Sequence, residues 1–100
     1  MEIKVLKEKA EVTVFLKGRL DTPAAQEVAA ELEPLKNEAS GTIIMDCGEL
    51  SYISSSGLRI FLAFRKAAAE KGGKIIVRNI TNDIRTVFMM TGLLNLFEIQ

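Results

Sequence analysis

Three consecutive serines, Ser54 to Ser56, stand directly before a glycine and a long apolar segment. Serine at such a junction is typical of a helix N-cap, where the hydroxyl accepts a hydrogen bond from an N–H group of the first turn. Capping explains only one of the three serines. Gly57 destabilises a helix by about 1 kcal/mol relative to alanine, unless another group approaches its backbone closely. Two interpretations remain open: a cap alone, or a surface where a partner or an anion meets the helix start.

A phosphate on one of these serines would bring a charge of about −1.5 to −2 to the positive end of the helix dipole. The fold tolerates an anion there, whereas a docked partner with carboxylates facing the same spot would be repelled. The segment therefore predicts a serine that acts as an off-switch for protein binding.

The chain has no histidine and one cysteine, Cys47. This excludes the usual zinc sites and any Ser-His-Asp or Cys-His centre. A serine nucleophile would need Lys66 or Lys74 as its base, and the G-x-S-x-G elbow is missing because Ser54 occupies the position of its first glycine. Gly72-Gly73 lacks the neighbours of a phosphate loop and predicts a helix stop. We expect no catalytic residue, no metal and no cofactor.

Length and charge narrow the class of protein. One hundred residues suit a single domain, 1–100, and thirteen basic residues balance thirteen acidic ones without a basic run, so we expect no nucleic-acid partner. We find no signal segment and no apolar run of roughly 18 residues, which favours a cytoplasmic protein without a membrane partner. The lysines Lys4, Lys7 and Lys9 are typical of a protected edge strand and favour a monomer.

Hydrophobic periodicity predicts the elements that carry the serines. Alternation over Ile3 to Leu16 predicts a hairpin whose second strand stops at Gly18, and Thr22 as N-cap with Pro23 behind it predicts a helix to about Leu35. The apolar stripe of this helix is Ala25, Val28, Ala29 and Leu32.

Strands and helices then alternate. The predicted elements are a doubly buried strand at 42–45 that closes on Asp46, a helix at 57–71, a strand at 74–77, a helix at 83–90 and a last strand at 96–99. The order ββαβαβα(β) predicts an α/β fold with a mixed sheet and packed helices.

Several side chains have both a structural and a functional interpretation. The helix at 57–71 is apolar over most of its circumference. It either lies wedged between the sheet and its neighbouring helices, which we expect, or exposes a functional apolar patch. Met89 and Met90, beside Phe88, form a flexible apolar cluster that could adapt to a partner, but such residues are more often core, and we expect them there. Asp46 is interpreted as a turn former, and Asp21 as functional if its loop lies beside the serines. Arg59 is either a solvated charge or a partner contact.

Two motifs together resemble one known family. The segment Tyr52 to Arg59, Y-I-S-S-S-G-L-R, and the segment Gly18 to Asp21, G-R-L-D, resemble the anti-sigma-factor antagonists of the STAS domain family. The likeness extends over essentially the whole chain. It implies a β-first α/β fold in which a buried strand ends in a turn like Asp46-Cys47-Gly48.

The resemblance also implies a function. The unmodified protein would bind an anti-sigma factor with serine kinase activity and so free a sigma factor, phosphorylation of Ser56 would end the binding, and a serine phosphatase would restore it. The residues that this assigns to partner binding are Asp21, Ser54, Ser55, Gly57, Leu58 and Arg59.

The chain departs from the family pattern at one position. Many members have aspartate two residues before the phosphorylated serine, where this chain has Ser54. Either the switch survives with altered hydrogen bonds, or the chain is a constitutive STAS binding module of a lipid-transport or stress-sensing system. We expect the switch to survive, because a serine still provides the acceptor.

Overall fold

The N-terminal alternation forms the predicted hairpin. In the computed structural model, which describes residues 1–100, β1 (Glu2–Glu8) pairs antiparallel with β2 (Glu11–Leu20). The second strand does not stop at Gly18, contrary to the prediction. Gly18 adopts a φ of +103° at a register shift, where glycine avoids the strain of a side chain, and pairing continues to Leu20.

The remaining strands continue the sheet in chain order. β3 (Thr42–Ile53), β4 (Lys74–Arg78) and the short β5 (Glu98–Ile99) add parallel to β2, giving the order β1-β2-β3-β4-β5. Ile43, Ile44 and Met45 are fully buried, which confirms the central strand.

The predicted end of this strand at Asp46 is wrong. The Asp46 carboxylate accepts a hydrogen bond from the N–H of Gly48 at 3.0 Å, and its other oxygen accepts one from the Asn79 side chain. Asp46 does bond its own backbone, as a turn former would, but it does so within an irregular stretch of β3. The strand continues beyond it to Ile53.

The first helix differs from the prediction at both ends. α1 (Thr22–Leu32) is capped by Asp21, whose Oδ1 accepts from the N–H of Ala24 at 3.0 Å, and not by Thr22. Pro34 has no N–H to continue the α-helical ladder, so a 3₁₀ helix, η1 (Glu33–Glu38), follows. Ala25, Val28 and Leu32 are buried as predicted, whereas Ala29 is exposed.

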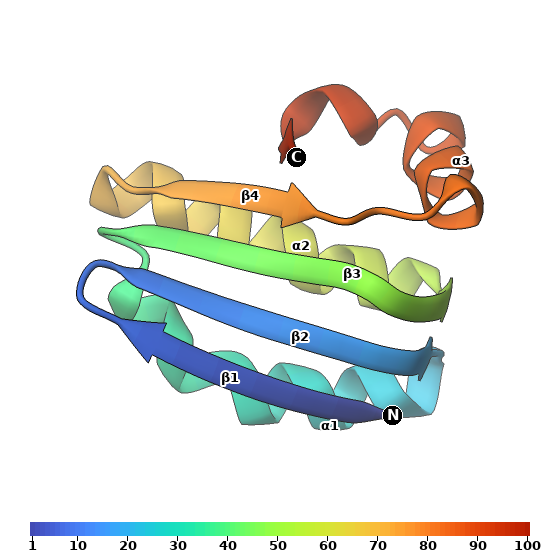
Figure 1. Ribbon diagram of the computed structural model, residues 1–100, viewed down its shortest axis with the longest axis horizontal. Helices are drawn as coiled ribbons and strands as arrows, with labels where there is room; N and C mark the ends of the chain where they lie inside the picture. The colour runs from blue at the N-terminus through green and yellow to red at the C-terminus, as the bar shows by residue number, and fades with distance from the viewer.

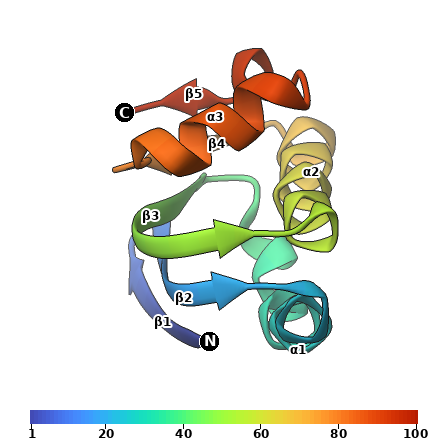
Figure 2. The ribbon, with the colours of Figure 1, turned by 90° about the vertical axis from the view of Figure 1, so that its right-hand side faces the viewer.

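The second helix, α2 (Ser55–Lys71), is wedged between other elements as predicted. Figure 2 shows α1 and α2 side by side on one face of the sheet, with α3 in front of β4. The apolar residues of α2 are accordingly buried on several sides, among them Leu58, Ile60, Phe61, Phe64, Ala67 and Ala68. Gly72 ends the helix with a φ of +76°, which confirms the predicted stop.

Three phenylalanines join α2 to the C-terminal part of the chain. The ring of Phe61 lies 5.4 Å from that of Phe88 and 6.2 Å from that of Phe97, both edge to face. Phe88 belongs to α3 (Asn82–Met90), which Thr81 caps, and Phe97 follows the 3₁₀ helix η2 (Leu94–Leu96). These contacts attach α3 to the core.

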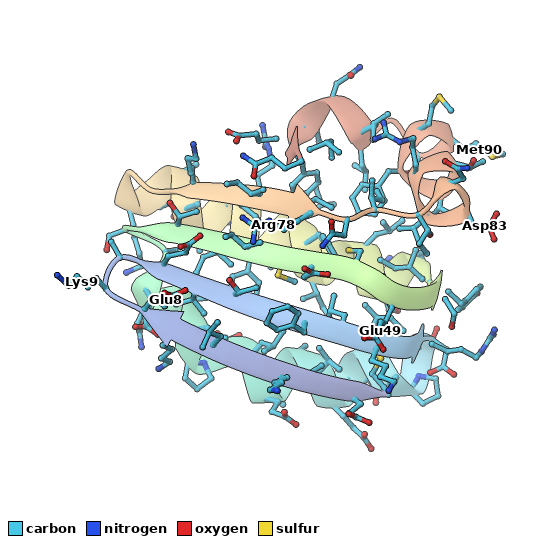
Figure 3. The ribbon with its side chains drawn as sticks, in the orientation of Figure 1. Glu8, Lys9, Glu49, Arg78, Asp83 and Met90 are labelled. Atoms are coloured by element: carbon cyan, nitrogen blue, oxygen red, sulfur yellow. The ribbon has the colours of Figure 1, made fainter.

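The prediction that Met89 and Met90 lie in the core is wrong. Their side chains are 58% and 82% exposed, because Ile84 and Phe88 provide the buried face of α3. Figure 3 shows Met90 pointing away from the sheet.

The other face of the sheet has no covering helix. In Figure 1 this face is turned toward the viewer, with α1 and α2 behind it. Glu49 and Arg78 lie on it in Figure 3, and Phe15 is 38% exposed.

None of the helices has the length and apolar character that crossing a membrane requires.

A buried and an exposed residue of α3 together test how this helix packs. We expect Phe88→Ala to lower the free energy of unfolding by about 3–5 kcal/mol, because it removes a fully buried ring and leaves a cavity. The control Met90→Ala, two residues along the same helix, should change it by less than about 0.5 kcal/mol. Urea unfolding followed by circular dichroism measures both, and equal effects would contradict this packing.

Burial also controls the single thiol. Desolvation, with a smaller contribution from the Asp46 carboxylate, raises the pKa of Cys47 to about 12. The folded protein therefore keeps this thiol protonated at pH 8. We expect Cys47 to resist a thiol-alkylating reagent at pH 8 in the folded protein and to react quickly in 8 M urea, as mass spectrometry would record. Rapid labelling of the folded protein would contradict this burial.

Candidate functional site at the first turns of two helices

The starts of α1 and α2 lie side by side because the strands before them are paired. Leu20 and Ile53, the last residues of β2 and β3, are register partners in the parallel pair. Figure 2 looks onto this end of the sheet, where both strands turn into their helices. The Asp21 loop therefore does lie beside the serines, which is the condition that the sequence left open.

Ser54 ties the two loops together. Its backbone N–H and its hydroxyl both donate to the Leu20 carbonyl, each at 2.9 Å. The same hydroxyl oxygen accepts from the N–H of Gly57 at 3.1 Å, which makes Ser54 the N-cap of α2. Serine thus fills the acceptor role as expected and also donates, which an ionised aspartate cannot do.

Ser55 and Ser56 are the free hydroxyls of the segment. Neither has a hydrogen-bond partner within the chain, in contrast to Ser54. Ser55 is exposed, and Ser56 is half-buried against α1. Of the three serines, these two remain available for chemistry with a partner.

Gly57 is explained by the protein's own core. A Cβ atom on Gly57 would lie 2.8 Å from Cγ of Leu20 and 2.9 Å from Cγ1 of Ile53, closer than real Cβ contacts. The close approach inferred from the sequence is real, but the helix start approaches β2 and β3 and not a partner. Leu58 is likewise buried, so neither residue offers a side chain to a docked protein.

A shallow apolar groove runs between the two helices beside Ser56. It has a volume of about 250 Å³ and is lined by Ala25, Gln26 and Ala29 of α1 and by Ser56, Arg59, Ile60 and Ala63 of α2. Sequence reasoning missed this groove, because the 3.6-residue period assigned Ala29 to the core. The small residues on both facing helix surfaces were the available signal.

Three charged residues flank the serine segment. Arg59 is exposed on α2, and none of the four ion pairs of the chain includes it. Asp21 caps α1 with its carboxylate. Arg19 lies over the Tyr52 ring, 4.3 Å from its centre, a pair that the sequence motif contained but did not single out.

The arrangement does not support serine catalysis. Lys66 lies about 15 Å along α2 from Ser56 at 1.5 Å per residue. Lys74 begins β4 at the opposite end of the sheet and pairs with Glu98 at 3.3 Å. No three acidic, cysteine or histidine side chains gather as metal ligands. What the site offers is an apolar groove, two free hydroxyls and one free cation.

The contribution of the Ser54 hydrogen bonds to stability can be tested with Ser55 as the control position. We expect Ser54→Ala to lower the free energy of unfolding by about 1–3 kcal/mol, because it removes a cap and a hydrogen bond to a part-buried carbonyl. Ser55→Ala should change it by less than about 0.5 kcal/mol, since its hydroxyl is exposed and unbonded. Thermal or urea unfolding measures the difference, and equal stabilities would show that the tie contributes nothing.

The chain is similar over most of its length to proteins named as anti-sigma factor antagonists. BtrV of Bordetella bronchiseptica, named as a candidate anti-sigma factor antagonist, is 30% identical over 84 residues, which cover 84% of this chain and 72% of that protein. The anti-sigma-B factor antagonist of Bacillus subtilis is 24% identical over 100 residues, covering 100% and 91%.

The fold itself has solved counterparts. The anti-sigma factor antagonist SpoIIAA in its unphosphorylated form superposes with a TM-score of 0.77 at 22% identity, covering 99% of this chain and 87% of that one. The phosphorylated form from Bacillus gives 0.76 at 24% identity, covering 99% and 91%. The STAS domain family model matches residues 2–100, and the chain therefore belongs to the STAS domain family.

Proposed function

We propose that this protein is an anti-sigma-factor antagonist that binds an anti-sigma factor through the first turns of α1 and α2 and is switched off by phosphorylation of Ser56. One observation carries the proposal: the free hydroxyl of Ser56 lines the groove between these helices. The relatives in Bordetella and Bacillus carry the corresponding names, which supports the same role here. The protein would act without catalysis of its own, in the cytoplasm and as a monomer.

Hydrogen bonding favours Ser56 over the other serines as the modified residue. The Ser54 hydroxyl is already donor and acceptor, and its phosphorylation would break the tie to Leu20. Ser55 is free but does not line the groove. A kinase would transfer the γ-phosphoryl group of ATP to Oγ of Ser56, with release of ADP and the hydroxyl proton, and a phosphatase would hydrolyse the ester.

The partner-binding residues would act in two ways. Ser55, Ser56 and Arg59 would contact the partner, since they line or border the exposed groove. Asp21, Ser54, Gly57 and Leu58 would position these residues: the first two cap helices, and the last two pack α2 against β2 and β3.

Electrostatics explains how a phosphate would end the binding. The groove is nearly apolar, with Arg59 as the only charged residue in its lining, so a partner that fits it buries few charges and presents acid to Arg59. A phosphate of about −1.5 to −2 charges at Ser56 would meet those acids at close range. Juxtaposed like charges cost several kcal/mol, and every 1.4 kcal/mol weakens binding about tenfold.

The proposal is tested by capture and titration with variants of Ser56. Ser56→Glu and the uncharged control Ser56→Ala are used beside the wild type to capture partners from lysate of the source organism, followed by mass spectrometry and calorimetric titration of the protein captured. We expect the wild type and Ser56→Ala to bind an ATP-binding anti-sigma factor. Ser56→Glu should bind at least about 100-fold more weakly, and incubation with ATP should add one phosphate, at Ser56.

Other outcomes would separate the alternatives. Equal binding by Ser56→Glu and Ser56→Ala would contradict the phosphate switch. Capture of transport or stress-sensing components by all three forms would instead identify a constitutive STAS binding module.

A further inference from the structure

Arg59 is an unneutralised cation beside the serine segment. It is exposed, and the four ion pairs of the chain join other residues. Across the groove α1 places the neutral Gln26, and no carboxylate lines this groove. The charge of Arg59 is therefore free in the unmodified protein.

Helical spacing brings Arg59 next to Ser56. Residues three apart on a helix are neighbours, with about 5–6 Å between their Cβ atoms, and both side chains line the same groove. An arginine fork extends well beyond that distance and matches the oxygens of a phosphate. The N–H groups of Ser55 and Ser56 have no intrahelical acceptor, because the first intrahelical bond of α2 runs from the N–H of Leu58 to the Ser54 carbonyl. The N–H of Gly57 already donates to the Ser54 hydroxyl.

We propose that Arg59 is the counter-ion, within the chain, of a phosphate on Ser56. This inference rests on the proposed function and deepens it. Modification would then act twice on the partner surface: it adds an anion at Ser56, and it engages the one cation that the groove offers to an acidic partner. Phosphorylation would turn the charge of this surface from positive to negative without a change of fold.

The absence of aspartate at position 54 strengthens this pairing. Ser54 is neutral, so no carboxylate on α2 competes for Arg59 at the first turn. Two charged groups lie at the end of β2 beside this junction: Asp21, which bonds to Ala24 at the start of α1, and Arg19, which lies on Tyr52. Asp21 opposes a phosphate and Arg19 favours it, and neither stands on the helix face of Ser56.

Phosphorus NMR measures the pairing directly. Phosphoserine is incorporated at position 56 during translation, so no kinase is needed, and the second pKa of the phosphate is titrated. A nearby cation favours the dianion, so this pKa should lie below the value of about 6 for an exposed phosphoserine. We expect Arg59→Gln to raise it by roughly 0.3–0.7 unit, in line with an exposed ion pair.

Lys66→Gln is the matched control. Lys66 is an exposed cation on the same helix, seven residues from Arg59, and also joins no ion pair. It should shift the phosphate pKa by about 0.1 unit or less, because solvent and salt screen that separation. Both substitutions are at exposed positions, and circular dichroism verifies that the variants fold.

Two results would overturn the pairing: an unchanged phosphate pKa in Arg59→Gln, or an equal shift in Lys66→Gln, which would reveal only a general field. Neither titration involves a partner. An Arg59-dependent pKa in a phosphoprotein that still binds its anti-sigma factor would refute the proposed off-switch and uphold the ion pair. Loss of binding on phosphorylation, together with a phosphate pKa that does not depend on Arg59, would uphold the off-switch and refute the ion pair.

Discussion

The Leu20 carbonyl is the point on which the site depends. It accepts both the N–H and the hydroxyl of Ser54, and so joins the end of β2 to the end of β3 at the residue that caps α2. Asp21, the next residue, caps α1. Two helices thus begin at adjacent, fixed positions, and Gly57 lets α2 start directly on Leu20 and Ile53. The groove between the helices is a consequence of this junction.

Much of the fold was predictable because local signals agreed with one another. Alternation, the continuous apolar run at β3 and the glycine after α2 gave the element order and the mixed sheet. The predicted bounds of α1 were wrong because a single residue determines each end. Asp21 caps the helix in place of Thr22, and Pro34 ends its α-helical hydrogen bonding. β3 continues beyond Asp46 because its pairing with β2 resumes after the register shift at this stretch. Met89 and Met90 could not be placed, since a short helix buries only one face.

The candidate site was predictable in its residues but not in its surface. The motif identified the serines and Asp21, and capping rules assigned a hydroxyl acceptor at the helix start. The groove depends on how α1 and α2 lie against each other, which no periodicity reports. Gly57 shows the same limit, because the atoms that exclude a Cβ there belong to Leu20, distant in sequence, as well as to Ile53. Likewise, the sequence could not show that Arg59 is unpaired, because this depends on which residues form the ion pairs of the folded chain.

If this protein presents the face formed by α1 and α2 to an anti-sigma factor, as we propose, NMR mapping of the bound surface will show it. The isotope-labelled protein is titrated with the anti-sigma factor while its amide signals are followed. We expect the shifts to concentrate at residues 21–29 and 54–63, around Ser56 and Arg59. Shifts confined to the uncovered sheet face around Phe15 and Arg78, with α1 and α2 unaffected, would contradict it.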